Sequence, residues 1–108
     1  MAFEQSPANL STIVSVVTND TSDDANGPSV DAKAVYLRVY WDGKVFAFHH
    51  HSLDGRLWNL ARLFSLPLGA GEPTVEMTAQ SPVGDDCTVD FSQVSWQKAV
   101  LPDLRDGS

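Results

Sequence analysis

The chain has 108 residues, of which 43% are apolar, and its formal net charge is −7, from 14 acidic and 7 basic residues. This length favours one domain with one core, which we place at residues 1–101. The excess of carboxylates argues against nucleic acid and against an anionic membrane as partners, because both are bound mainly through lysine and arginine.

Segments with the two-residue period of a β-strand recur along the chain, and none has a convincing helical period. The predicted strands cover residues 11–18, 34–41, 44–51, 56–66, 74–80 and 87–97, with a bulge near Ser92-Gln93 in the last. Turn-forming residues predict loops at 19–28, 67–73 and 81–86. The charged tail, residues 102–108, is predicted to be disordered. The expected fold class is therefore all-β and antiparallel, with about six strands.

Two Asp-Gly pairs predict tight hairpin turns, Asp42-Gly43 and Asp54-Gly55. A type I′ turn needs positive φ at both central residues, which Asp-Gly tolerates well. These turn centres place Phe46 opposite both Val39 and Leu63. Directly opposed residues share a face of a sheet, so one face is predicted to be apolar and to carry Val35, Leu37, Val39, Phe46, Phe48, Leu57, Ala61 and Leu63.

The opposite face of the same strands is predicted to be aromatic and basic, which is unusual on so acidic a chain. Aromatic rings stack on sugars and other flat groups, and arginine binds carboxylates, phosphates and hydroxyls. These side chains can equally well cover a half-exposed sheet without binding anything. The candidate ligand-binding residues on this face are Tyr36, Arg38, Tyr40, His49, Trp58 and Arg62, with His51 and Leu60 beside them.

The single cysteine, Cys87, follows two aspartates and has no histidine near it in sequence. A buried, inert thiol is the better interpretation than a nucleophile. One cysteine cannot form an internal disulfide, and the N-terminus has neither the basic start nor the apolar stretch of a signal peptide. A reducing, cytoplasmic location is expected.

Two groups of residues are weak candidates for a metal site. His49 and His51 share a face of a strand, but two histidines need further ligands, and His50 on the other face is interpreted as a histidine at the edge of the core. The predicted loop at 19–28 offers oxygen ligands for calcium, but it lacks the glutamate of an EF-hand. A solvated loop is the favoured interpretation of Asp20, Asp23, Asp24 and Asn26, and no metal or other cofactor is expected.

Catalytic patterns are weak throughout the chain. Glycoside hydrolysis uses two carboxylates about 5 to 10 Å apart, and no pair of acids stands close together on one predicted strand face. There is no Gly-rich phosphate loop and no CxxC. The hairpin at residues 52–58 resembles the aspartate-box hairpin of sialidases, in which the aspartate is structural, so Asp54 is assigned to the turn.

Four motifs, taken in order, resemble those of one domain family. Residues 10–18, followed by Ser22-Asp23, are similar to L-S-x-V-V-T and S-D-W, and Arg38 with the turn glycine Gly43 resembles an arginine–glycine hairpin. Residues 52–62 look like Y-S-x-D-G-x-x-W-x-L-x-R, and residues 79–91 are similar to A-x-S-P-x-G followed by V-x-F. The family is the regulation-of-enolase-like domain family of unknown function, which is similar in fold to concanavalin A-like lectins and glucanases. Asp24 and His51 depart from its usual tryptophan and tyrosine.

The resemblance implies an antiparallel β-sandwich, a concanavalin A-like jelly roll, of which this chain resembles only the C-terminal half. A half-sandwich would leave open sheet edges and an uncovered apolar face, so we expect either a truncated copy or self-association of two chains. The leading expected function is a non-catalytic binding module, with carbohydrate as the first ligand class. The alternative is a regulatory protein–protein interaction domain for a metabolic enzyme such as enolase. A glucanase-like hydrolase comes third.

Overall fold

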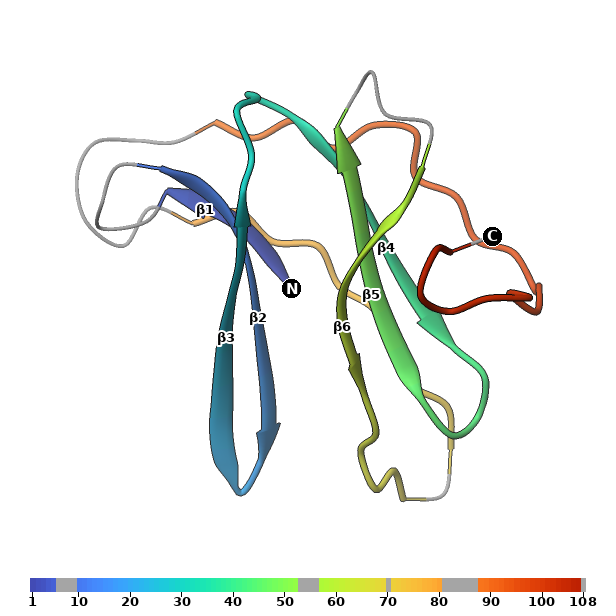
Figure 1. Cartoon of the computed structure of the whole chain (residues 1–108). Coiled ribbons are helices and arrows are strands. Elements are labelled where there is room, and N and C mark those ends of the chain that lie inside the picture. Colours follow the sequence, from blue (N-terminus) through green and yellow to red (C-terminus); the bar gives the residue numbers. More distant parts are fainter. Residues whose placement is uncertain (6–9, 53–56, 70, 81–87, 108) are drawn as a thin grey trace. The chain divides into compact units, whose positions relative to one another are not determined.

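The computed structural model describes residues 1–5, 10–52, 57–69, 71–80 and 88–107. Its strands form two three-stranded antiparallel sheets, of order β1-β2-β3 and β4-β5-β6. The bounds are β1 Ala2–Gln5, β2 Ser11–Asn19, β3 Thr21–Ser29, β4 Val35–Trp41, β5 Phe46–Ser52 and β6 Asn59–Phe64 (Figure 1). Two such sheets and no helix among the described residues confirm the all-β fold class and are compatible with a β-sandwich. The described part of the chain accordingly has no helix able to cross a membrane.

The chain divides into two compact units, residues 1–66 with 100–108, and residues 67–99. All six strands belong to the first unit. The strands predicted at 74–80 and 87–97 are wrong, because the described residues of both segments form no strand. Their apolar side chains are largely exposed, as in Val75 at 57% and Trp96 at 79%. A two-residue period predicts which side chains share a face if the segment is a strand. A strand also needs the backbone of a neighbouring segment for its hydrogen bonds. Cys87 lies outside the described residues.

The first sheet contains two strands that the sequence did not indicate, β1 and β3. β3 covers most of the segment predicted as a loop, and it pairs with β2 through a hairpin in which Asn19 faces Thr21. The chain reverses at Asp20, whose φ of 64° is left-handed. β3 is an edge strand with mostly exposed side chains, a position that tolerates polar residues and Pro28. Hydrogen bonds to β2 therefore override the turn propensity of this segment.

In the second sheet, the β4–β5 hairpin has a different turn centre from the predicted one. Val39 pairs with Phe48 and Trp41 with Phe46, so the turn is centred on Gly43-Lys44 instead of Asp42-Gly43. Gly43 has a φ of 97°, as the first central residue of a type II′ turn requires. The Oδ1 atom of Asp42 accepts the N–H groups of Lys44 and Val45, at 2.8 and 2.9 Å. These bonds lower the pKa of the Asp42 carboxyl.

The revised turn shifts the β4–β5 register by two residues, which leaves every side chain on its predicted face. The β5–β6 register is different, because it slips between Phe48 and His49. His49 pairs with Leu60 as the predicted register requires, but Phe48 pairs with Arg62 and Ala47 with Leu63. The predicted faces of Arg62 and Leu63 are therefore wrong. The second turn, Asp54-Gly55, lies outside the described residues.

An aromatic cluster fills the Phe48 face of the second sheet. The rings of Phe46 and Phe64 stack with centroids 5.1 Å apart, and Phe48 meets Phe64 edge-on at 4.9 Å. Trp41 stacks on Phe46 at 6.2 Å. In the other sheet Ile13 is the most buried apolar side chain. Leu57, predicted to belong to the apolar face, is 77% exposed.

Candidate functional site

The strand register brings four of the six candidate side chains onto one face of the β4–β5 pair. Tyr36 pairs with His51, Arg38 with His49, and Tyr40 with Ala47, so these residues point the same way from the sheet. Trp58, just before β6, joins them through its ring contacts with both histidines. We call this surface the aromatic–basic face; its residues are Tyr36, Arg38, Tyr40, His49, His51 and Trp58.

Trp58 is the centre of this face. The guanidinium carbon of Arg38 lies 4.4 Å from the centroid of its ring, within the range of a cation–π contact. The His51 ring meets Trp58 nearly perpendicularly, at 4.3 Å and 79°, and His51 in turn stacks on Tyr36 at 4.4 Å. The rings of Tyr36, His51 and Trp58 remain partly exposed. The arrangement offers an outward aromatic surface with a cation held against it.

Two hydrogen-bond donors lie deeper in the same face. Nε2 of His49 lies 2.7 Å from the carbonyl oxygen of Leu104, and Nη2 of Arg38 donates to the carbonyl oxygen of Gly107 at 2.9 Å. Because a carbonyl only accepts, the His49 proton must be on Nε2. His49 is completely buried. Its other ring nitrogen, Nδ1, and the Nε atom of Arg38 have no hydrogen-bond partner among the described residues.

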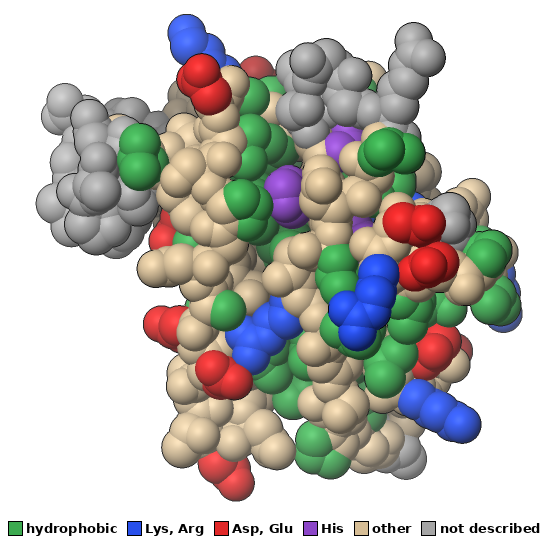
Figure 2. All heavy atoms as spheres, in the orientation of Figure 1, with side chains coloured by type: hydrophobic (Ala, Val, Ile, Leu, Met, Phe, Trp, Pro, Cys, Tyr) green, Lys and Arg blue, Asp and Glu red, His purple; other side chains and the backbone are tan. Residues whose placement is uncertain are grey.

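Burial also determines the charge of His49. It lowers the pKa of the imidazole, the Leu104 carbonyl raises it in part, and the positive charge of Arg38 lowers it again. The net direction is downward, so the ring is neutral near pH 7 and donates from Nε2. His50, on the opposite face, is buried as well, and burial followed by the neighbouring histidines lowers its pKa. Figure 2 shows histidine atoms in small patches among hydrophobic and other side chains.

The carbonyl groups bound by Arg38 and His49 belong to residues 103–107, which we call the C-terminal turn. The N–H of Gly107 donates to the carbonyl of Asp103 at 2.9 Å. The Asp103 carboxylate accepts the N–H groups of Arg105 and Asp106, at 2.7 and 3.4 Å. The turn lies beside β4 at the red end of the chain in Figure 1. Residues 102–108 were expected to be disordered; the described part of this tail is a closed turn on the sheet.

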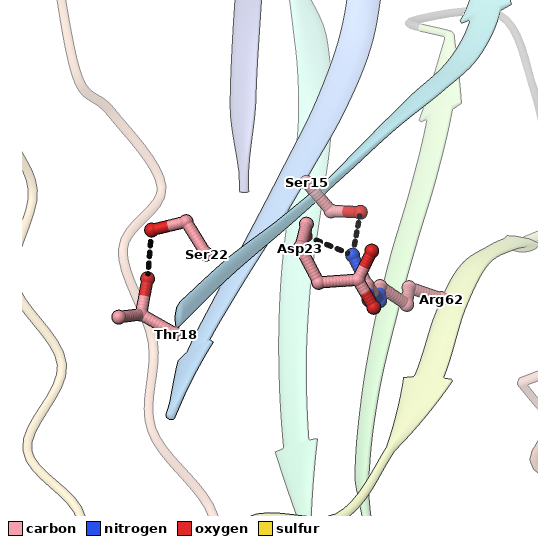
Figure 3. Close-up of polar contacts among 5 residues, drawn as sticks. All are labelled: Ser15, Thr18, Ser22, Asp23 and Arg62. Carbon is pink, nitrogen blue, oxygen red and sulfur yellow. Dashed lines mark hydrogen bonds and ion pairs between the residues drawn. The ribbon is translucent and has the colours of Figure 1, made fainter. Parts of the chain in front are cut away.

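Arg62 is the candidate that the structure places elsewhere. Its Nη2 lies 2.8 Å from Oδ2 of Asp23, and its Nη1 donates to the Asp23 carbonyl at 2.9 Å and to the Ser15 hydroxyl at 3.4 Å (Figure 3). Arg62 therefore links β6 to β2 and β3 and is absent from the aromatic–basic face. The one-residue slip after Phe48 explains the difference.

The acidic candidates for calcium are distributed along the β2–β3 hairpin. Asp23 faces Val17 and Asp24 faces Val16, so these neighbouring carboxylates leave opposite sides of the strand. Asp23 is paired with Arg62. Within the described ranges no three histidine, cysteine, aspartate or glutamate side chains gather closely enough to hold a metal ion.

A second surface feature, a shallow depression, was not indicated by the sequence. It lies between the end of β3 and the strands β5 and β6, and it is lined by residues 28–31 together with His50, Asn59 and Leu60. The Nδ2 atom of Asn59 lies 3.5 Å from the His50 carbonyl. Residues from both sheets contribute to it, and only the tertiary structure brings them together.

Comparison with models of protein families shows to which family the chain belongs. A family model described as "Protein of unknown function (DUF1349)" matches residues 1–99. The chain belongs to the DUF1349 family. No curated protein and no solved structure gives a significant match. The DUF1349 match contains every strand and every residue of the aromatic–basic face, and it ends before the C-terminal turn.

Proposed function

We propose that this DUF1349 chain is a non-catalytic binding module and that its ligand contacts the aromatic–basic face. The proposal rests on the groups around Trp58. The guanidinium carbon of Arg38 lies 4.4 Å from the centroid of the Trp58 ring, and the centroid of the His51 ring lies 4.3 Å from it. An aromatic surface beside fixed donors suits a ligand that has both apolar faces and acceptor oxygens. Carbohydrate is such a ligand, and the resemblance to concanavalin A-like lectins makes it the first class to test.

A glycan array probed with the full chain tests this proposal, with binding constants of the retained glycans measured by calorimetry. We expect Trp58→Ala to weaken binding about tenfold or more, which corresponds to a loss of about 1.4 kcal/mol or more in the free energy of binding. Trp96→Ala is the matched control, because Trp96 is 79% exposed and lies in the other unit. A folded chain that retains no glycan, or equal affinities of the Trp58→Ala and unmodified chains, would contradict a carbohydrate site here.

One observation favours a second candidate, a regulatory protein–protein interaction domain. Both hydrogen-bond donors of the face, on half-buried Arg38 and buried His49, bind main-chain carbonyl oxygens. A protein partner supplies such acceptors in any extended or turn segment. The family resemblance makes a metabolic enzyme such as enolase the first partner to test. Retention of purified enolase on the immobilised chain, undisturbed by free sugars and weakened by Trp58→Ala, would support this candidate over the first.

A further inference from the structure

The C-terminal turn covers the two donors of the aromatic–basic face. The carbonyls of Leu104 and Gly107 are three residues apart, and they meet Nε2 of His49 and Nη2 of Arg38. The turn is closed within itself by the hydrogen bonds to Asp103. The turn therefore has hydrogen bonds of its own, and its carbonyls of Leu104 and Gly107 face the sheet.

The contact at Gly107 is specific for glycine for two reasons. Its φ of 72° is left-handed, which other residues adopt at a cost. A Cβ at this position would also lie 2.8 Å from the Cβ atom of Trp58 and would collide with the Arg38 guanidinium. Closure by Asp103 and close packing of Gly107 together define the sequence requirement as Asp-x-x-x-Gly.

We infer that the aromatic–basic face is a receptor for a peptide turn of the type Asp-x-x-x-Gly, and that residues 103–107 of the same chain occupy it. This inference rests on the proposed function for the location of the site. It adds that a segment of the same chain is bound there. An external ligand that needs Arg38, His49 or the covered side of Trp58 must displace the turn. Hydrogen bonds from Arg38 and His49 hold the turn, and none of its residues belongs to a strand, so the turn can leave without breaking the pairing of the strands.

The occupancy is tested on the full chain labelled with 5-fluorotryptophan, whose three tryptophans give separate fluorine resonances. We expect Gly107→Ala to shift the resonance of Trp58 toward the position of an exposed indole and to leave that of Trp41 unchanged. Arg105→Ala is the matched control in the same turn, because its side chain is exposed, and it should leave Trp58 unchanged. Asp103→Ala opens the turn without adding bulk and should shift Trp58 in the same direction as Gly107→Ala.

The receptor property is tested by adding the turn back in trans. A capped peptide of residues 102–107, titrated into the Gly107→Ala chain, should restore the original Trp58 resonance with saturation. The same peptide carrying Gly107→Ala should not restore it. An unchanged Trp58 resonance in both the Gly107→Ala and Asp103→Ala chains would overturn the occupancy, and a peptide that fails to restore the resonance would overturn the receptor.

These readouts use no external ligand, so they separate this inference from the proposed function. If no glycan or protein binds the face, the Trp58 shift and its rescue by peptide are still expected. If a ligand does bind, Gly107→Ala should tighten its binding, because the competing turn has been removed. Equal affinities for the unmodified and Gly107→Ala chains would show that ligand and turn occupy different sites.

Discussion

Arg62 connects the two sheets, and loss of its side chain should destabilise the fold more than loss of its ion-pair partner, the Asp23 carboxylate. Its side chain is 15% exposed, whereas that of Asp23, its ion-pair partner, is 76% exposed. The guanidinium also donates to the main-chain carbonyl of Asp23 and to the hydroxyl of Ser15. Removal of the arginine therefore breaks all three contacts, whereas removal of the aspartate carboxylate breaks only the ion pair.

The expected magnitudes follow from this asymmetry. An exposed ion pair contributes about 0–1 kcal/mol, so Asp23→Ala should reduce the free energy of unfolding by about 0.5 kcal/mol. A hydrogen bond to a charged group contributes about 1.5–3 kcal/mol, and exposure to water reduces this contribution. The bond to the Asp23 carbonyl is short but exposed, and the longer bond to the Ser15 hydroxyl is partly buried. We therefore assign about 2 kcal/mol to the loss of both together in Arg62→Met, which keeps most of the apolar stem.

Urea unfolding followed by circular dichroism measures both changes. With an m-value of about 1–3 kcal/mol/M, the midpoint should fall by about 1 M in Arg62→Met and by about a quarter of that in Asp23→Ala. Lys98→Met, which removes an exposed cation from the other unit, is the control and should leave the midpoint unchanged. A loss in Asp23→Ala as large as that in Arg62→Met would contradict this assignment, because it would mean that the ion pair with the exposed carboxylate supplies all of the stabilisation by Arg62.

Two further predictions concern His49 and Gly43. Because burial holds the pKa of His49 below its ordinary value of 6.5, the unfolded chain binds the proton more tightly. The free energy of unfolding should therefore fall as pH is lowered from about 7 to 5, and His49→Gln should flatten this dependence in urea midpoints measured across that range. Gly43→Ala places a side chain at a φ of 97° and should cost about 1–2 kcal/mol of unfolding free energy. Gly69→Ala, at an open position, should leave the same thermal or urea midpoint unchanged; equal losses in both variants would contradict the turn assignment.

The strands that could be predicted are those whose own side chains carry the information. In β2, β4 and β5, alternating apolar residues coincide with strong β propensity, and the structure confirms these strands within a few residues. β3 has neither property, since it is polar, contains Gly27-Pro28, and owes its conformation to pairing with β2. The reverse holds for residues 74–80, which have the alternation but no partner strand.

The candidate site divides in the same way. Tyr36, Arg38, Tyr40 and His49 were placed correctly on one face because a two-residue error in the turn preserves the alternation of side chains. Arg62 was misplaced because a single extra residue at an irregularity reverses that alternation. No local pattern in β6 marks where the slip occurs.

The pattern of residues therefore predicts an all-β chain, the four strands β2, β4, β5 and β6, and a face that combines aromatic and basic side chains. These follow from alternation and propensity, which are properties of neighbouring residues. The folded chain was needed to show which segments pair, which face Arg62 occupies, and that the C-terminal turn lies on Arg38 and His49. Those contacts join residues far apart in the chain, such as Leu104 and His49, and their free energy depends on burial and hydrogen bonds that exist only after folding.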